Sequence, residues 1–288
     1  MKILVTGAAG RLGSVVCRTL AQRGHQVLAT DQKYGDGLDV PQRLADLRDP
    51  LASYGLLEGQ DAVAHLGNIP NLAAGTSPQI VLSDNTTINV NVFRAAVDVG
   101  VRRIVFASSI QAMIRLEEGT PFEPPYGLPY LPLDGDAPAN PGYNLYGLSK
   151  ELGERLLRVL CERFPELACT ALRFPFLAGE QYAARIQQPL LPSSLNLQEG
   201  LTHLTFSDAA DVTALALERL GPGYHQYFPA QGLSVEGYAP AQVVATFFAG
   251  TPLRRPLAEL TSLVDLSAVE RDLGFRPSPP LTVQLYRP

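Results

Sequence analysis

The chain has few cysteines and histidines and no block of basic residues. Three cysteines occur among 288 residues, without a CxxC pair or an even framework. This pattern predicts reduced core residues of a cytoplasmic protein rather than a disulfide scaffold. The four histidines lack the spacing of metal ligands, which argues against a metal site. A net charge of −5 without a basic block argues against a nucleic-acid partner.

Long hydrophobic runs are also missing. No apolar run reaches the ~18 residues that a transmembrane helix needs, so we expect no membrane partner. The apolar start of the chain is interrupted by Thr6 and followed by a Gly-rich turn, where the hydrophobic region of a signal peptide would continue. Apolar residues make up 46% of the chain, which excludes disorder as its dominant state.

Short apolar runs alternate with helical patterns through the first 175 residues. This alternation predicts right-handed βαβ units, and therefore the α/β fold class with a Rossmann-type doubly wound parallel sheet. We expect strands at 2–6, 26–30, 62–66, 103–107 and 169–174, and helices at 11–23, 48–57, 78–99 and 143–164. A Pro-rich stretch over 115–142 interrupts the pattern, and its aromatic residues favour a packed lid over a flexible linker.

The elements beyond Pro175 are shorter and less regular. We expect helices at 209–220, 236–249 and 267–273, the last capped by Ser267, and a strand at 224–228. The pattern indicates a small C-terminal α/β region that packs on the larger part without a linker.

A glycine-rich turn, Gly7-Ala8-Ala9-Gly10-Arg11-Leu12-Gly13, joins the first predicted strand to the first predicted helix. The first glycine permits a tight turn, the second lets the backbone approach a pyrophosphate, and the third lets helix and strand pack closely. Amide groups at the helix start would face the phosphates, aided by the helix dipole. In this context the turn predicts dinucleotide binding rather than a plain strand-to-helix connection.

Asp31 follows the second predicted strand, 24 residues after Gly7. A carboxylate there can accept hydrogen bonds from both ribose hydroxyls of adenosine and would repel a 2′-phosphate, so NAD is favoured over NADP. The alternative is a turn-forming aspartate. Arg11 and Lys33 leave some tolerance of NADP open.

Tyr146 and Lys150 lie four residues apart on the helix expected at 143–164, so both face the same side. An ammonium near the phenol favours the phenolate, as would the charge of an oxidised nicotinamide. Tyr146, with a reference pKa of about 10, could then act as a base near neutral pH. Tyr143 is not equivalent, because Gly147 occupies the position four residues on. A chance pair on a helix surface is the alternative.

Ser108 and Ser109 follow the strand expected at 103–107. The carboxyl ends of parallel strands border the ligand crevice, and a hydroxyl there can bind the reacting substrate oxygen. Ser109 is therefore the third candidate catalytic residue. The alternative is a serine pair that caps the following turn.

With these motifs, the chain resembles the extended short-chain dehydrogenase/reductases, the NAD-dependent epimerase/dehydratase family. The resemblance runs nearly end to end. It is carried by residues 5–13, Asp46-Leu47, 64–68, Asn85, 100–109, 146–150, 172–175 and 265–277.

The resemblance implies a catalytic set of Ser109, Tyr146 and Lys150, with Lys150 also contacting the nicotinamide ribose. His65 is expected to be a buried structural residue and Asn85 a structural residue that bonds helices. The expected cofactor-binding residues for NAD are Gly7, Ala9, Gly10, Arg11, Leu12, Gly13, Asp31, Asp46, Leu47, Leu66, Gly67, Asn68, Ala107, Tyr146, Lys150, Phe174 and Pro175.

Two regions are expected: an NAD-binding domain with the Ser/Tyr/Lys site over 1–175, and a smaller substrate-binding region over 176–288 with some elements returning to the first. Candidate substrate contacts are Gln111, Asn144, Arg185 and His203, although a surface position is favoured over a ligand role for His203. Residues 201–212 lack the arginine that nucleotide-sugar enzymes of the family usually carry, which weakens the case for a sugar diphosphate.

The leading hypothesis is an NAD-dependent oxidoreductase or epimerase that transfers a hydride between NAD and a carbinol carbon of a sugar or nucleotide sugar, with Tyr146 as acid/base. One alternative is a uronate or aldose dehydrogenase on a free sugar, because the sequence is also similar to uronate dehydrogenases. The other is a non-catalytic NAD-binding sensor. The motifs do not separate epimerase, dehydrogenase and dehydratase outcomes. The resemblance is compatible with a homodimer formed through the helices near 78–99 and 143–164.

Overall fold

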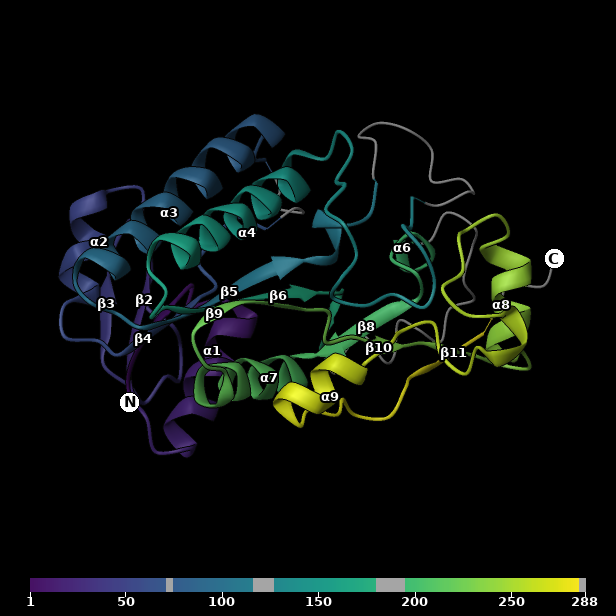
Figure 1. Ribbon diagram of the computed structural model, residues 1–288. Coiled ribbons are helices and arrows are strands. Elements are labelled where there is room, and N and C mark those ends of the chain that lie inside the picture. Colours follow the sequence, from purple (N-terminus) through teal and green to yellow (C-terminus); the bar gives the residue numbers. More distant parts are fainter. Residues whose placement is uncertain (71–74, 116–126, 180–194, 285–288) are drawn as a thin grey trace.

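A computed structural model describes residues 1–70, 75–115, 127–179 and 195–284. A seven-stranded sheet forms its centre (Figure 1), in the order β3-β2-β1-β4-β5-β6-β9, with every neighbouring pair parallel. The predicted α/β class and Rossmann-type doubly wound sheet are confirmed. The strands are β1 (Lys2–Thr6), β2 (Gln26–Asp31), β3 (Gln42–Leu44), β4 (Ala62–His65), β5 (Arg103–Ser109), β6 (Ala168–Phe174) and β9 (Gly223–Tyr227).

Helices cover both faces of this sheet (Figure 1). One face carries α2 (Pro50–Leu57), α3 (Pro78–Asp98) and α4 (Leu145–Arg163); the other carries α1 (Arg11–Gln22), α7 (Phe206–Arg219) and α9 (Ser267–Leu273). Successive strand residues point to opposite faces, so Ile3 and Val5 join the core beneath α1 and α7, whereas Leu4 joins the core beneath α3 and α4. Burial on both faces explains why the inner strands β1, β4, β5 and β6 appear as short apolar runs.

A third apolar core lies beyond the carboxyl ends of β5 and β6, toward α8 (Figure 1). It includes Leu131 and Leu133 of the Pro-rich stretch, both fully buried, whose backbone amides donate to the carbonyls of Pro252 and Leu263. The described part of that stretch is therefore packed. The surrounding elements are β7 (Leu177–Ala178), α6 (Leu195–Gln198), β8 (Thr202–Thr205), β10 (Gln231–Gly232), β11 (Ser234–Val235), α8 (Pro240–Phe247) and β12 (Thr282–Val283).

The helix ends show where side-chain chemistry sets the boundaries. α7 begins earlier than predicted because the Thr205 hydroxyl accepts a hydrogen bond of 3.0 Å from the Asp208 amide. The prediction that Ser267 caps α9 is wrong. Ser267 is the first helical residue, and the carboxylate of Asp265 accepts hydrogen bonds from its amide and hydroxyl.

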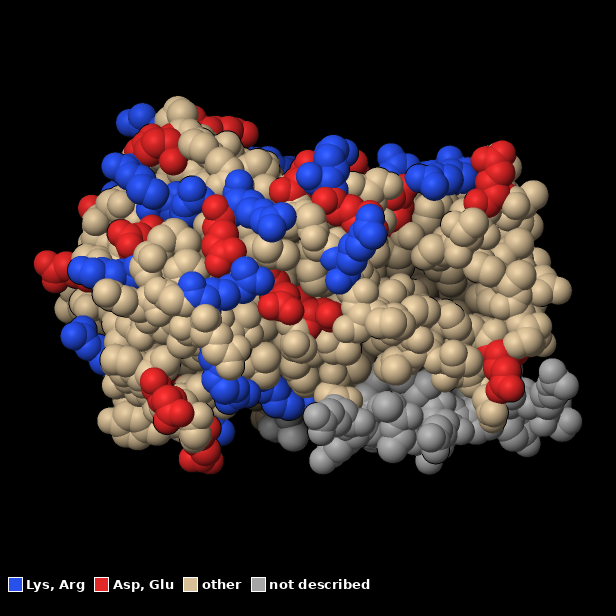
Figure 2. Space-filling view, turned by 90° about the horizontal axis from the view of Figure 1, so that it is seen from below, with Lys and Arg blue, Asp and Glu red and all other residues tan. Residues whose placement is uncertain are grey.

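On the face formed by α1, α7 and α9, Lys and Arg side chains alternate with Asp and Glu instead of forming a basic stripe (Figure 2). One such pair joins Arg23 to Glu218 at 2.9 Å. Among the described helices, none is both long and apolar enough to cross a membrane.

Candidate active site

The glycine turn between β1 and α1 has the close packing that its sequence predicts. Gly7 has φ of +68°, and a Cβ there would lie 2.8 Å from the carbonyl group of Leu66. A Cβ on Gly13 would lie 2.1 Å from the carbonyl oxygen of Gly7, so only glycine lets α1 begin this close to β1. Gly10 precedes α1 at its N-cap position and is exposed.

Asp31 ends β2 directly beside this turn. Its carboxylate accepts hydrogen bonds from the Ala9 amide at 3.0 Å and the Gln32 amide at 2.7 Å. The turn and the carboxylate, 24 residues apart in sequence, therefore line one part of the surface. Arg11, by contrast, places its guanidinium 5.4 Å from the centre of the Phe206 ring on α7.

The end of β4 is fixed by a threonine that the motif analysis missed. The Thr6 hydroxyl accepts hydrogen bonds from the amides of Leu66 at 3.1 Å and Gly67 at 3.0 Å, and it bonds His65 at 2.7 Å. His65 is fully buried, and burial lowers its pKa to about 3, so the ring is neutral. The expectation of a structural histidine is confirmed. Asn85 also has a structural role, because its amide bonds the Ile69 carbonyl and the Ser149 hydroxyl.

The first turn of α4 is held against the segment after β5. Asn144 caps the helix through a hydrogen bond from the Gly147 amide at 3.1 Å. A Cβ on Gly147 would lie 2.2 Å from the Gln111 carbonyl oxygen, so glycine at this position permits the contact. The contact brings Tyr146 to the end of β5, whereas Tyr143 is 63% exposed and turned to solvent.

The structure brings the three candidate catalytic residues together at the carboxyl ends of β4 and β5. The Lys150 ammonium donates to the Asn68 side-chain oxygen at 2.7 Å and the Ala107 carbonyl at 2.8 Å, and lies 5.5 Å from the centre of the Tyr146 ring. The Ser109 hydroxyl lies close enough to Tyr146 to act on the phenol, and its effect is to lower the pKa of Tyr146.

Ser109 also accepts a hydrogen bond of 3.2 Å from the Gln111 amide, which caps the 3-10 turn Ile110–Ala112. Ser109 therefore caps this turn, as the alternative interpretation of the sequence has it, and is also the candidate catalytic residue. Phe174 and Pro175 are both buried where β6 ends.

The electrostatics of the chain by itself differ from the sequence expectation. Burial raises the pKa of Tyr146 to about 12, against the lowering effect of the Ser109 hydrogen bond, and the charge of Glu199 raises it further. Burial lowers the pKa of Lys150 to about 7, while Glu154 acts to raise it. The expected shift of the phenol toward phenolate is therefore absent in the chain by itself, because desolvation of the buried phenol raises its pKa.

A buried ion pair supports this site from behind. Arg173 in β6 and Glu154 in α4 form two parallel hydrogen bonds of 2.8 and 2.7 Å, with both residues at most 2% exposed. Ser108 donates to the same carboxylate at 2.5 Å, and Arg173 also donates to the Ala137 carbonyl. The sequence feature that could have predicted a buried ion pair is Arg173, a charged residue inside the apolar strand motif Leu-Arg-Phe-Pro.

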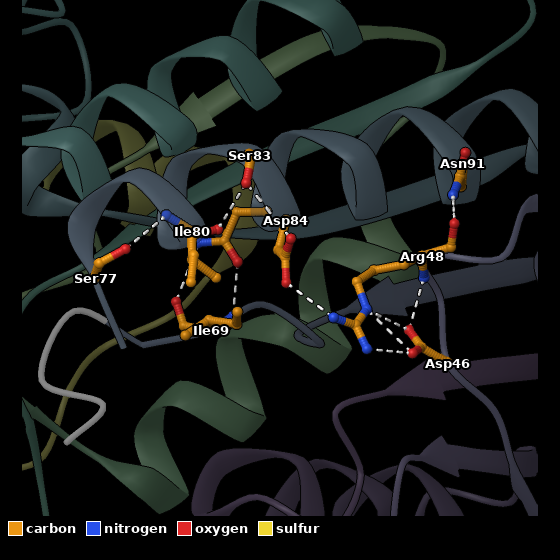
Figure 3. Close-up of polar contacts among 9 residues, drawn as sticks. Asp46, Arg48, Ile69, Ser77, Ile80, Ser83, Asp84 and Asn91 are labelled. Carbon is orange, nitrogen blue, oxygen red and sulfur yellow. Dashed lines mark hydrogen bonds and ion pairs between the residues drawn. The ribbon is translucent and has the colours of Figure 1, made fainter. Parts of the chain in front are cut away.

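Asp46 and Leu47 follow β3, at the same edge of the sheet as Asp31. The Arg48 guanidinium donates to both oxygens of Asp46 and reaches Asp84 on α3 at 3.2 Å (Figure 3). Hydrogen bonds from Arg48 lower the pKa of Asp46 to about 2. Asn91 donates to the Leu47 carbonyl at 2.9 Å, so the loop is tied to α3.

The residues predicted to contact the substrate lie in different surroundings. Gln111 and Asn144 are buried and bonded to each other at 2.9 Å, and Gln111 also donates to Glu199 at 3.1 Å. The sequence analysis missed Glu199 because no motif surrounds it. Arg185 lies outside the described residues. The prediction that His203 is a surface residue is wrong: it is 2% exposed, because β8 is the central strand between β10 and β7.

The three cysteines are free and buried, as expected. In the described ranges, no group of three or more His, Cys, Asp or Glu side chains could hold a metal ion.

The chain is similar in sequence and in fold to known proteins. A model of the NAD dependent epimerase/dehydratase family matches residues 3–206, more than half of the chain. The chain is 33% identical over 237 residues to the 2-alkyl-3-oxoalkanoate reductase of Stenotrophomonas maltophilia, an alignment that covers 77% of this chain and 67% of that protein.

A second curated relative, the uronate dehydrogenase of Pseudomonas syringae pv. tomato, is 29% identical over 168 residues, which are 57% of this chain and 55% of the relative. Among solved structures, the UDP-glucose 4-epimerase from Bifidobacterium longum, in complex with NAD+ and UDP, has the same fold, with a TM-score of 0.68. Its sequence identity is 19%, and the match covers 98% of this chain and 95% of that one.

Proposed function

Because the chain belongs to the NAD-dependent epimerase/dehydratase family, an enzyme family of the oxidoreductase type, we propose that it transfers a hydride between NAD and a carbinol carbon of a sugar or nucleotide sugar. In this proposal Tyr146 is the acid/base. The observation that carries it is the convergence of Ser109, Tyr146 and Lys150 at the strand ends adjoining the glycine turn.

The described residues fit a dinucleotide. Gly7 and Gly13 let the turn pack closely against Leu66 and the start of α1, Gly10 is exposed just before α1, and Asp31 presents a carboxylate beside the turn. We propose that the turn binds the pyrophosphate, Asp31 the adenosine ribose, and Lys150 the nicotinamide ribose. The remaining proposed NAD contacts are Asp46, Leu47, Leu66, Gly67, Asn68, Ala107, Phe174 and Pro175.

Bound NAD would supply the hydride acceptor and, in its oxidised form, a positive charge. Tyr146 would take the proton of the carbinol hydroxyl on its phenolic oxygen, while Ser109 holds the substrate oxygen by a hydrogen bond. Burial keeps the phenol protonated in the chain by itself, so added positive charge is needed to favour the phenolate. Asn68 and the Ala107 carbonyl keep the Lys150 ammonium in place.

The Tyr146→Phe variant tests this assignment. We expect kcat/KM to fall by at least about 100-fold, the usual range for a lost acid/base, with little change in the Kd of NAD. The absorbance of NADH after mixing with NAD and a panel of sugars measures kcat/KM, and calorimetry measures the Kd of NAD. Tyr143→Phe, at an exposed position on the same segment, is the control. Substantial activity of Tyr146→Phe would contradict the proton-transfer role.

A free sugar is a second candidate substrate. The relative named uronate dehydrogenase and the lack of arginine in residues 201–212 both favour it over a nucleotide sugar. NAD binding without turnover on any substrate would instead support a sensor.

We further propose that residues 176–288 supply most of the substrate-binding region, while α7 and β9 pack with the NAD-binding part. A homodimer through α3 and α4 is supported by the exposed apolar side chains Ile80 and Val90 on α3 and Leu152 and Val159 on α4. The reduced state of the buried cysteines favours a cytoplasmic location.

A further inference from the structure

Glu199 is a buried carboxyl group beside the candidate active site that the proposed mechanism does not use. It follows α6, is 3% exposed, and accepts a hydrogen bond of 3.1 Å from the Gln111 amide. Gln111 in turn accepts a hydrogen bond from Asn144, two residues before Tyr146. The carboxyl is close enough for its charge to raise the pKa of Tyr146.

The second carboxyl oxygen of Glu199, Oε2, is buried and has no hydrogen-bond partner in the described part of the chain. A buried acceptor without a partner is destabilising, and native proteins keep few of them. Of the seven such side-chain atoms among the described residues, four belong to Gln198, Glu199 and His203. The charge of Glu199 acts on Tyr146, so the unmet hydrogen-bonding capacity of Oε2 lies beside a reacting group, where a bound substrate hydroxyl would satisfy it.

The chemistry of a carboxyl group limits what can bind there. Gln111 is fixed in orientation by Asn144, so its amide nitrogen faces Glu199 and leaves Oε2 as the available atom. Burial raises the pKa of Glu199 to about 7, although hydrogen bonds from the Gln111 side chain and the Phe176 backbone favour the charged form. A hydroxyl group can donate to such a carboxyl, whereas a carboxylate or phosphate would be repelled strongly in a desolvated site.

We propose that Glu199 binds a hydroxyl of the substrate through Oε2 and thereby selects neutral polyhydroxylated substrates against sugar acids. The inference rests on the proposed function, because it places the substrate carbinol at Tyr146. It makes Glu199 a specificity-determining residue and disfavours the uronate alternative.

The Glu199→Gln and Glu199→Ala variants test the inference, with Glu162→Gln on the exposed side of α4 as control. Each protein is mixed with NAD and neutral aldoses, polyols or uronates, and kcat and KM are measured from NADH absorbance. We expect wild type to prefer neutral substrates. Glu199→Gln keeps the shape and removes the charge, so the ratio of kcat/KM for neutral substrates to that for uronates should fall at least tenfold.

Glu199→Ala should raise KM for the neutral substrate at least tenfold and abolish the thermal stabilisation that this substrate gives in the presence of NAD. A residue that merely holds Gln111 would lower activity on both substrate classes alike and leave the ratio unchanged. Turnover with an unchanged ratio in Glu199→Gln, or a wild type that prefers uronates, overturns this inference alone. No turnover on any substrate, despite NAD binding, overturns the proposed function and this inference with it.

Discussion

The Arg173–Glu154 pair allows a sharp prediction about stability. Arg173 is the largest fully buried side chain among the described residues, and its guanidinium meets the Glu154 carboxylate through two hydrogen bonds. Burial opposes its charge, yet the hydrogen bonds that it donates to Glu154 hold the pKa of Arg173 above its ordinary value. The Arg173→Met variant keeps most of the apolar volume and leaves the Glu154 charge buried without its cation.

Removing one partner of a buried ion pair costs about 3–5 kcal/mol, because the remaining charge is uncompensated. Whole domains are stable by only about 5–15 kcal/mol, so this loss is large. At roughly 2–4 °C per kcal/mol for chains of 150–250 residues, we expect the Tm to fall by about 10 °C. The double variant Arg173→Met/Glu154→Leu removes both charges and should recover at least half of the loss.

Thermal unfolding followed by circular dichroism measures these changes. Arg102→Met is the matched control, because Arg102 pairs with Glu166 at 2.7 Å while both side chains are at least half exposed. Such surface pairs contribute about 0–1 kcal/mol, so the control should hardly change the Tm. The reasoning is refuted if Arg173→Met lowers the Tm no more than Arg102→Met, or if the double variant is no more stable than the single one.

Two other predictions follow from the cofactor cradle and the buried lysine. Asp31→Ala should weaken NAD binding more than NADP binding by calorimetry, because the lost carboxylate accepts from ribose hydroxyls and repels a 2′-phosphate; equal losses would remove that role. Burial lowers the pKa of Lys150 to about 7 from 10.5, so the charged ammonium penalises folding below about pH 7 and the penalty is relieved as pH rises toward 10.5. Relative to Lys150→Met, wild type should therefore gain stability in urea unfolding between about pH 7 and 10, and a constant difference would contradict the shift.

Local patterns were enough to predict six of the seven strands of the large sheet and the helices that flank it. The inner strands β1, β4, β5 and β6 are largely buried, so they appear as apolar runs. The glycine turn at 7–13 could be predicted because the space for a Cβ there is limited by residues of the turn itself and its neighbours. The short strands β3, β7, β8 and β10–β12 were missed because two to four residues show no period. Their pairing depends on partners distant in the chain.

By itself, the sequence determined the alternation of strands and helices, the glycine turn at 7–13 with Asp31 after the second strand, and the placing of Tyr146 and Lys150 one helical turn apart. Only the tertiary structure decided which side chains became desolvated together. The burial of His203 follows from the central position of β8, and the approach of Glu199 to Tyr146 joins segments more than 50 residues apart. The raised pKa of Tyr146 has the same origin, because the cost of removing a charge from water depends on everything packed around it.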